Sequence, residues 1–363
     1  MRILHVITTL DTGGAERLMV DLLPRLIDMG NHVELLLFNG FGTPFKKELE
    51  ENGVQIHELY CEAFNGKGSG VNNPLNIFRL RRYLSGYDII HTHNTACQIY
   101  VPIARLLFMS HVKLATTEHN TTGRRRSIWW LRLFDKWVYR QYDEVVCIGD
   151  STRDSLKRYL GRDCQTRVIY NGVNIDRFLR PIKDISHQNH FVITMVAGFR
   201  PQKDQDTLIK AFNHLPDNYY LKLVGEGERE AYLKKMCHEL NLDDRISFMG
   251  ARMDVPQILE QSDVVVLSSH WEGLSLSSIE GMASGRPFVA SDVDGLRDIV
   301  RGAGMLFPHG DDLVLARSIQ ELCENPELYR NVAMACQERA KDYDISIMAD
   351  RYNQLYKDLM QKK

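Results

Sequence analysis

The chain has 363 residues, of which 44% are hydrophobic and 25% are charged, and its formal net charge is −2. These values are typical of a globular protein, and the length exceeds what one ordinary core supports, so we expect two domains. The near-neutral charge argues against nucleic acid as a partner. The seven cysteines are scattered without a C-x-x-C pair, which is typical of reduced thiols in a cytosol rather than of a disulfide framework.

The beginning of the chain predicts a βαβ unit. Ile3–Thr8 is a β-rich run, Ala15–Met29 has a helical pattern that ends at Gly30, and Val33–Phe38 is again an apolar strand. Strand, helix and strand in this order indicate a parallel sheet. The opening MRILHVITTL resembles a signal peptide, but a Gly-rich turn and a helix follow directly, so we interpret it as the first strand. No apolar run is long enough to predict a membrane-spanning helix.

Two successive runs of strands and helices make up the rest of the chain. The first run continues with expected strands at Asp88–His91, Lys113–Thr117, Glu144–Ile148 and Arg167–Ile169. The pattern then restarts, with expected strands at Phe191–Ala197, Tyr220–Val224, Ile246–Phe248, Val264–Ser268 and Phe288–Ala290. We therefore predict an α/β fold of two Rossmann-like parallel-sheet domains, joined near Asn174–Asn189. Helices are expected over Leu313–Leu359, and a mobile loop over Asn65–Asn76.

Two glutamates eight positions apart occur in the segment SHWEGLSLSSIEGMASGRPFVA, which begins at Ser269. Glu272 lies in a Gly-containing loop after an apolar strand, and Glu280 lies in a predicted helix. A helix start exposes backbone N–H groups that can bind an anion. Carboxylates on both sides of that anion suit a ligand with phosphates and hydroxyls, such as a nucleotide-sugar. Alternatively, Ser277 and Glu280 form a capping box that satisfies backbone donors.

A pair of cations follows the first strand of the second run, in the sequence GFRPQKDQDTLIKAF. Arg200 and Lys203 lie between that strand and a predicted helix, so we expect them at the carboxyl edge of a parallel sheet, where ligands bind. Two cations there would neutralise the charge that develops on a departing diphosphate. The alternative is that both are solvated side chains near a helix start.

A Gly-rich turn precedes the first predicted helix, in the sequence TTLDTGGAERL. Gly13 and Gly14 let the backbone come close to a bound group, although a tight turn between strand and helix needs glycine as well. The dinucleotide fingerprint G-x-G-x-x-G, with an acidic residue ending the second strand, is absent.

Several residues have the chemistry of metal ligands, yet we predict no obligatory metal. His91 and His93 share a face of a strand, but the sequence shows no third ligand for zinc. His119 follows another predicted strand and is either a site residue or a structural one. Asp292-x-Asp294 matches a D-x-D metal motif, but such short patterns arise often, and a second occurs at Asp342–Asp344.

Basic and aromatic residues gather in the middle of the first domain, at Arg124, Arg125, Arg126, Trp129 and Trp130. On the helix that follows, a narrow polar stripe is formed by Arg132, Asp135, Lys136 and Arg140. A basic cluster beside Trp-rich apolar surface suits contact with an anionic membrane. The alternative is a helix that buries its apolar positions and keeps one face wet.

Taken together and in order, these motifs resemble the retaining glycosyltransferases of the family-4 type, which have the two-domain GT-B fold. The resemblance rests on the E-x7-E pair Glu272 and Glu280 and on the segments GGAE, YNGVN, VGEGE and MLFPHGD. These motifs cover nearly the whole chain. The resemblance implies an acceptor domain over residues 1–173 and a donor domain over 174–344, facing each other across a cleft, with the helix 345–363 packing back on the first domain.

The resemblance also implies roles for individual residues. Glu280 would bind the ribose hydroxyls and Glu272 the transferred sugar, while His119 would lie near that sugar. Backbone N–H groups for the diphosphate and sugar would come from Gly273, Leu274, Ser275 and Leu276, and Gly13 and Gly14 would face the cleft. Lys203 matches the family's lysine, but the usual arginine position is nearer Gly198, so Arg200 would have to act from a shifted place.

The function implied is transfer of a hexose, with retention, from a UDP- or GDP-sugar co-substrate to a hydroxyl of a glycan or lipid-linked acceptor, without cofactor or metal. The expected setting is surface polysaccharide or lipid-linked oligosaccharide assembly, in the cytoplasm or at the inner face of the cell membrane. Two alternatives stay open: a nucleotide-sugar epimerase on the same fold, and a catalytically silent scaffold subunit that binds donor.

Overall fold

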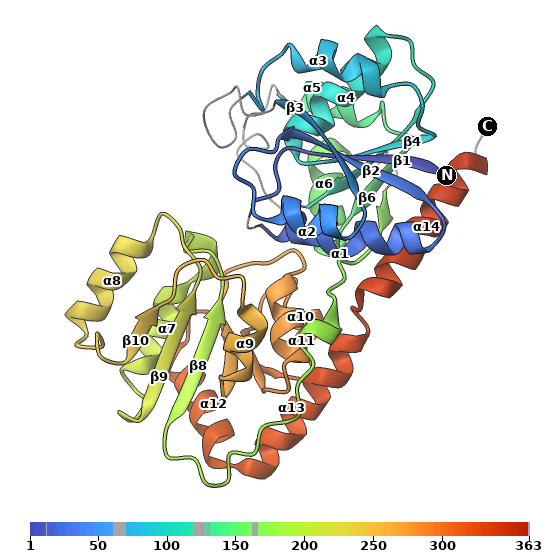
Figure 1. Cartoon of the computed structure of the whole chain (residues 1–363). Coiled ribbons are helices and arrows are strands. Elements are labelled where there is room, and N and C mark those ends of the chain that lie inside the picture. Colours follow the sequence, from blue (N-terminus) through green and yellow to red (C-terminus); the bar gives the residue numbers. More distant parts are fainter. Residues whose placement is uncertain (12, 61–69, 120–127, 129–130, 162–165, 362–363) are drawn as a thin grey trace. The chain divides into compact units, whose positions relative to one another are not determined.

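The computed structural model describes residues 1–11, 13–60, 70–119, 128, 131–161 and 166–361. The chain forms two compact units, one made of Met1–Gly172 with Ile345–Lys363 and the other of Val173–Asp344. Each unit contains one parallel sheet with helices packed against it (Figure 1). None of the described helices combines the length and the apolar character that a bilayer crossing requires.

The first unit contains a seven-stranded sheet in the order β3-β2-β1-β4-β5-β6-β7. Its strands are β1 (Arg2–Ile7), β2 (His32–Asn39), β3 (Gln55–Tyr60), β4 (Ile89–His93), β5 (Lys113–Glu118), β6 (Glu144–Cys147) and β7 (Arg167–Val168). Its helices are α1 (Gly14–Asp28), α2 (Phe45–Glu51), α3 (Asn76–Arg79), the 3-10 turn η1 (Leu80–Tyr83), α4 (Thr95–Leu107), α5 (Leu131–Tyr139), α6 (Asp150–Leu160) and α14 (Ile345–Gln361).

Alternate residues of the strands supply two cores, one on each face of this sheet. Ile3 and Ile7 of β1 point into a core that α1 and α14 complete, whereas Leu4 and Val6 join the opposite core. The last helix of the chain therefore covers the first strands of the same unit, next to α1 (Figure 1). One face of the first sheet is buried only when the C-terminal helix is in place.

The second unit contains a six-stranded sheet in the order β10-β9-β8-β11-β12-β13. Its strands are β8 (Phe191–Val196), β9 (Tyr219–Val224), β10 (Ile246–Phe248), β11 (Val264–Leu267), β12 (Phe288–Ser291) and β13 (Met305–Phe307). Its helical elements are η3 (Ile175–Arg177), η4 (Pro201–Lys203), α7 (Gln205–Phe212), α8 (Glu230–Glu239), α9 (Val255–Glu260), α10 (Leu276–Ala283), α11 (Arg297–Val300), α12 (Asp312–Glu324) and α13 (Pro326–Lys341).

Both sheets reverse their strand order beside the first strand of the unit. The reversal falls between β1 and β4 in the first sheet and between β8 and β11 in the second. At such a point the loops that leave the two strands diverge to opposite faces and open a crevice at the carboxyl edge. This edge is where the predicted site residues follow their strands.

The predicted fold class, two Rossmann-like parallel-sheet domains, is confirmed. Each predicted strand is present within two residues of its expected ends. The sequence did not reveal β3 and β13, which lie at sheet edges and are partly exposed. β3 has a mixed polar and apolar pattern, as an edge strand can. β13 is apolar throughout, but its three residues are too few to indicate a strand.

The expectation of a mobile loop over Asn65–Asn76 falls partly on residues 61–69, which lie outside the described part of the chain. The described end of that segment is an ordered turn. Asn76 is buried and donates from its side-chain amide to the carbonyl oxygens of Gly70 and Val71, at 3.0 and 3.1 Å.

Gly281 permits the close approach of α10 to the second sheet. A Cβ atom at this position would lie 2.8 Å from Val265 Cγ1 and 2.9 Å from the ring of Phe288. The Gly281→Ala change improves helix propensity by about 1 kcal/mol, but overpacking a core costs about 1–3 kcal/mol. We expect a net loss of stability, measured as a lower urea midpoint. A higher midpoint than that of the wild type would contradict this account of the packing.

Candidate active site

Hydrogen bonds fasten the loop after β8 to the loop after β11. Ser268, directly after β11, donates from its hydroxyl to the carbonyl oxygen of Asp204 at 2.8 Å. The backbone N–H of His270 donates to the carbonyl oxygen of Gln202 at 2.8 Å. The Gln202 amide in turn donates to the carbonyl oxygen of Trp271 at 2.8 Å. The two loops that diverge at the strand-order reversal are thus held in a fixed register.

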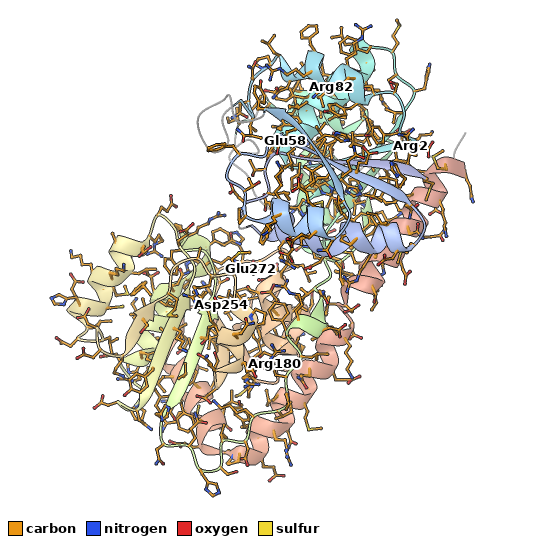
Figure 2. All side chains as sticks on the ribbon, in the orientation of Figure 1. Arg2, Glu58, Arg82, Arg180, Asp254 and Glu272 are labelled. Carbon is orange, nitrogen blue, oxygen red and sulfur yellow. The ribbon has the colours of Figure 1, made fainter. Side chains whose placement is uncertain are left out.

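The fixed register brings Lys203 against Glu272. Lys203 Nζ lies 2.5 Å from Glu272 Oε1, and the Ser269 hydroxyl donates to the same oxygen at 2.6 Å. The Glu272 side chain is 6% exposed and that of Lys203 is 18% exposed. A carboxylate withdrawn from water in this way needs a charged partner, because desolvation penalises an unpaired charge. Lys203 and Glu272 therefore form an ion pair, although they are 69 positions apart and were predicted separately. Figure 2 labels Glu272.

Arg200 lies in the same loop but makes no such contact. Its side chain is exposed and has no hydrogen bond or ion pair with any described residue. Its Nε atom lies 3.8 Å from the point where a Cβ atom would sit at Gly198. That separation is an ordinary van der Waals distance, so the guanidinium lies beside position 198. It is available for a ligand anion.

Glu280 lies in α10, which begins at Leu276 with Ser275 as its N-cap residue. Ser277 is consequently inside the first turn, so the capping-box alternative for Ser277 and Glu280 is wrong. The predicted anion-binding segment, residues 273–276, leads directly into this helix. The first N–H groups of an α-helix have no intrahelical acceptor, which leaves them for a ligand or water.

The predicted turn in the first unit lies at the N-terminus of α1, where Gly13 is the N-cap residue. A Cβ atom at Gly13 would lie 2.1 Å from the Glu16 carboxylate. The carboxylate of the first turn thus fills the space that the glycine leaves, as the positive end of a helix dipole favours. A phosphate at this turn would have to displace a flexible acidic side chain.

His119 follows β5 and contacts the end of the neighbouring strand β4. Its Nε2 atom lies 3.1 Å from His93 Nδ1, and burial lowers the pKa of His119 from 6.5 to about 4. Asn94, directly after β4, donates from its amide to the Thr8 hydroxyl at 3.0 Å. The carboxyl edge of the first sheet therefore presents His119 as a neutral imidazole.

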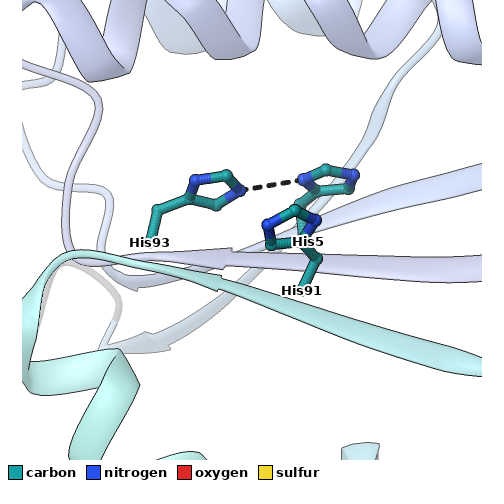
Figure 3. Close-up of side chains that lie close together, drawn as sticks. All are labelled: His5, His91 and His93. Carbon is teal, nitrogen blue, oxygen red and sulfur yellow. Dashed lines mark hydrogen bonds between the residues drawn. The ribbon is translucent and has the colours of Figure 1, made fainter. Parts of the chain in front are cut away.

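His5 joins His91 and His93 in a group of three histidines, of which the sequence indicated only the last two. The register of β1 on β4 pairs His5 with His91, and the three rings of His5, His91 and His93 stack with centroids 4.6–5.3 Å apart. His5 Nδ1 lies 3.0 Å from His93 Nε2 (Figure 3). Burial lowers the pKa of His5 to about 3 and the pKa values of the other two well below the usual range.

Two clusters among the described residues have the composition of a metal site. One is the stack of His5, His91 and His93. The other, in the second unit, consists of Asp204, His270 and His309. In this second cluster the Asp204 carboxylate already accepts from the Thr207 hydroxyl, and the two histidines are hydrogen-bonded to each other. By ligand type alone, zinc accepts the imidazoles of the first cluster and the imidazoles and carboxylate of the second.

The D-x-D pattern has a structural explanation. Arg297 Nε lies 2.5 Å from Asp292 Oδ1, and Arg297 Nη1 lies 3.2 Å from Asp294 Oδ1. Both carboxylates are therefore paired with one guanidinium.

An open pocket of about 670 Å³ lies elsewhere, at the exposed edge of the first sheet. Figure 2 labels three of the residues that line it: Arg2, Glu58 and Arg82. It contains none of the predicted site residues, and Lys46 pairs with Glu58 in it at 2.6 Å. This pocket therefore differs from the crevices at the strand-order reversals in two ways. It lies beside an edge strand, and charged side chains that line it already pair with one another.

The segment expected to contact a membrane is only partly described. Arg124, Arg125, Arg126, Trp129 and Trp130 lie outside the described residues. In α5, Asp135 is buried and accepts from the Tyr159 hydroxyl at 2.8 Å. Leu133 is 75% exposed and Trp137 is 42% exposed. The alternative of a helix that buries its apolar positions and keeps its polar stripe wet is therefore wrong for Leu133, Asp135 and Trp137. It holds for the buried Val138 and for the exposed Arg132 and Arg140.

Comparisons with known proteins agree with this architecture. The family model described as "Glycosyltransferase Family 4" matches residues 12–177, and that described as "Glycosyl transferases group 1" matches residues 180–340. EpsD of Bacillus subtilis (strain 168), a proposed glycosyltransferase, is 29% identical over 366 residues, which cover 90% of this chain and 96% of EpsD.

Two further similarities extend the comparison. An Escherichia coli enzyme, UDP-Gal:alpha-D-GlcNAc-diphosphoundecaprenol alpha-1,3-galactosyltransferase, is 27% identical over 306 residues, 76% of this chain and 77% of that enzyme. The crystal structure of HepE from Anabaena in complex with UDP-glucose covers 99% of this chain and 100% of its own, with a TM-score of 0.84 and 22% identity. The chain belongs to the family-4 glycosyltransferases and has their GT-B fold.

The buried histidines predict an acid-sensitive first unit. In the unfolded chain a histidine has a pKa near 6.5, whereas that of folded His5 is about 3. Between these values the unfolded state binds more protons, so stability falls as the pH falls through this window. From pH 7 to pH 5 the loss is about 2 kcal/mol for one such histidine.

The measurement is the urea midpoint in a Trp271→Phe background, where all remaining tryptophans belong to the first unit. The other three buried or half-buried histidines act in the same direction. A midpoint that stays constant from pH 7 to pH 5 would show that these imidazoles bind protons as readily in the folded state as in the unfolded chain.

Proposed function

We propose that this glycosyltransferase transfers a hexose from a UDP-sugar to an acceptor hydroxyl with retention of configuration, in the assembly of surface polysaccharide or lipid-linked oligosaccharide. The donor would bind the second unit and the acceptor the first. The observation that carries this proposal is the contact of Lys203 with Glu272 at the strand-order reversal of the second sheet. The diphosphate-linked acceptor in the name of the E. coli relative and UDP-glucose in the HepE crystals support the choice of substrates.

Each group has a role in breaking the bond between sugar and diphosphate. Negative charge moves onto the β-phosphate as that bond breaks, and Lys203 and Arg200 would stabilise it. The N–H groups of residues 273–276 would hold the diphosphate at the start of α10. Glu272 would orient the sugar through its hydroxyls, and Glu280, in the second turn of α10, would bind the ribose.

In the first unit His119 would donate a hydrogen bond to the transferred sugar. Burial keeps this imidazole neutral, so it would act through a hydrogen bond rather than as a charged acid. Gly13 and Gly14 would lie near the diphosphate and the acceptor after the Glu16 carboxylate moves aside. No metal is required in this scheme, because cations and helix N–H groups neutralise the phosphate charge. Full transfer in the presence of EDTA is the corresponding test.

Substitution of the ionic pair tests the site. Glu272→Ala and Lys203→Ala should each lower the rate of transfer at saturating donor by about 10²-fold, the usual effect of removing one group that stabilises transition-state charge. Initial rates with a panel of UDP- and GDP-sugars provide the measurement, and the anomeric form of the product reports retention. Wild-type rates in both variants would falsify the site.

A matched control separates chemistry from stability. Lys183 pairs with the buried Asp263 at 2.5 Å, at the amino end of β11 and thus at the opposite edge of the same sheet. Lys183→Ala should lower stability, because it leaves a buried carboxylate unpaired, without lowering the rate of the folded enzyme. Conversion of donor without acceptor would instead favour an epimerase, and donor binding without turnover a scaffold subunit.

Exposed apolar residues of α5 support peripheral contact with the cytoplasmic face of a membrane. Leu133 and Trp137 project from a helix that follows the basic segment 124–126. Leu133→Asn and Trp137→Asn should each weaken sedimentation with phosphatidylglycerol vesicles about tenfold, because an apolar side chain gains about 1.5–3 kcal/mol on burial. The control is Leu313→Asn, which changes a 48% exposed leucine in the second unit. Equal binding by all three variants would overturn the contact.

A further inference from the structure

An unbroken chain of hydrogen bonds runs from the C-terminal helix to His119. Tyr352 OH contacts Thr117 Oγ1 at 2.9 Å, which contacts His91 Nε2 at 2.8 Å. His91 Nδ1 contacts Tyr356 OH at 2.7 Å, which contacts His5 Nε2 at 3.2 Å. The chain continues from His5 Nδ1 to His93 Nε2 at 3.0 Å and from His93 Nδ1 to His119 Nε2 at 3.1 Å.

This arrangement leaves the three stacked histidines no free ring nitrogen. Both nitrogens of His5, His91 and His93 are already in hydrogen bonds within the chain. A metal ion bound by all three would have to break at least one hydrogen bond at each ring. The rings are also stacked within 22° of parallel, so their lone pairs do not converge on one point. The cluster is therefore better described as a relay of donors and acceptors than as a metal site.

In a chain of neutral imidazoles and hydroxyls, every group donates to its neighbour on the same side and accepts from its neighbour on the other. A neutral imidazole has one N–H donor and one acceptor nitrogen, so a ring that uses both must donate on one side and accept on the other. Tyr356 and Thr117 each supply one hydroxyl proton. If either oxygen accepted from both neighbours, its own buried proton would lack an acceptor. All six hydrogen bonds consequently point the same way, toward His119 or away from it.

The end of the chain at Tyr352 selects the direction. If the bonds point away from His119, Thr117 donates to Tyr352, whose own proton then has no acceptor among the described residues. Tyr352 is fully buried, so the unpaired proton would be costly. If the bonds point toward His119, Tyr352 donates to Thr117 and every hydroxyl proton in the chain is used.

We propose that Tyr352 and Tyr356 are positioning residues that fix His119 as the Nδ1–H tautomer, with its Nε2 atom occupied as an acceptor. The same direction places the proton on Nδ1 of His5, His91 and His93. The free histidine side chain prefers the opposite, Nε2–H, tautomer, so the network imposes a state that isolated residues would not adopt. His119 Nδ1 is the open end of the chain, because it has no partner among the described residues. His119 thus offers one N–H donor, in a set orientation, at the edge of the first sheet.

This inference bears on catalysis only through the proposed function, in which His119 donates to the transferred sugar. The tautomer itself is a property of the free protein. Long-range ¹H–¹⁵N correlation spectra of the full chain, labelled with ¹⁵N-histidine and recorded at pH 7, distinguish the two tautomers. We expect all four histidines as Nδ1–H. An Nε2–H or doubly protonated signal from any of them would overturn the proposal, whatever the enzyme transfers.

A variant that cuts the chain tests the role of the C-terminal helix. Tyr356→Phe keeps the ring but separates His5, His93 and His119 from the Tyr352 end. These three rings can then switch together, so Nε2–H signals should appear at His5, His93 and His119. The matched control is Tyr142→Phe, which removes another buried hydroxyl, bonded to Thr92 and to the Gln98 carbonyl oxygen outside the chain. It should leave all four tautomers unchanged. An unchanged His119 tautomer in Tyr356→Phe would overturn the positioning role.

Activity supplies a separate readout. An asparagine amide can place an N–H near the position of Nδ1, whereas a glutamine amide reaches the position of Nε2. His119→Asn should therefore keep about tenfold more transfer than His119→Gln, the value of one hydrogen bond to substrate. The reverse order would overturn the assigned donor atom. If His119→Ala transfers at the wild-type rate while the tautomers are as expected, the proposed contact with sugar fails and the network stands.

Discussion

The reversal of strand order between β8 and β11 is the constraint on which the proposed donor site depends. It makes the loops that leave these neighbouring strands diverge to opposite faces while they start side by side. Ser268 and Gln202 then fasten the two loops through backbone carbonyl groups. Because the backbone of both loops is fixed in this way, Lys203 Nζ is held 2.5 Å from Glu272 Oε1. Preorganisation of this kind lets charged groups act on a ligand with little reorganisation.

The first sheet uses its own reversal differently. Its strands β1, β4 and β5 bring four imidazoles together, and burial keeps them neutral. The two tyrosines that complete this polar network come from α14, the last helix of the chain, which also closes one hydrophobic core of the unit. The same helix therefore contributes to stability through its apolar face and to the state of His119 through two hydroxyl groups. A fully satisfied buried network of this kind specifies one arrangement, because any break leaves an unpaired polar group.

Much of the architecture could be predicted, because the signals are local. Central strands such as Val264–Leu267 are buried on both faces and read as continuous apolar runs, whereas the edge strand Gln55–Tyr60 carries a mixed pattern and was missed. Glu272 and Lys203 were found because each lies in the loop that leaves a strand, and His119 because it directly follows one. The capping-box interpretation of Ser277 was wrong, because the helix begins earlier than the motif indicates. The buried Asp135 of α5 contradicted its amphipathic pattern, because Tyr159 provides a hydrogen bond that the pattern does not contain.

The alternation of strands and helices, the two-domain fold class and the polar residues in the loops after strands follow from local patterns. Periodicity and spacing are properties of neighbouring residues, so the order of the residues is enough to predict them. Which of these polar residues contact one another became known from the folded structure. The pairing of Lys203 with Glu272 and the union of His5 with His91 depend on strand order and register, which join positions 69 and 86 residues apart. Contacts of this kind leave no local pattern, because the folded backbone, and not the spacing along the chain, sets the distance between them.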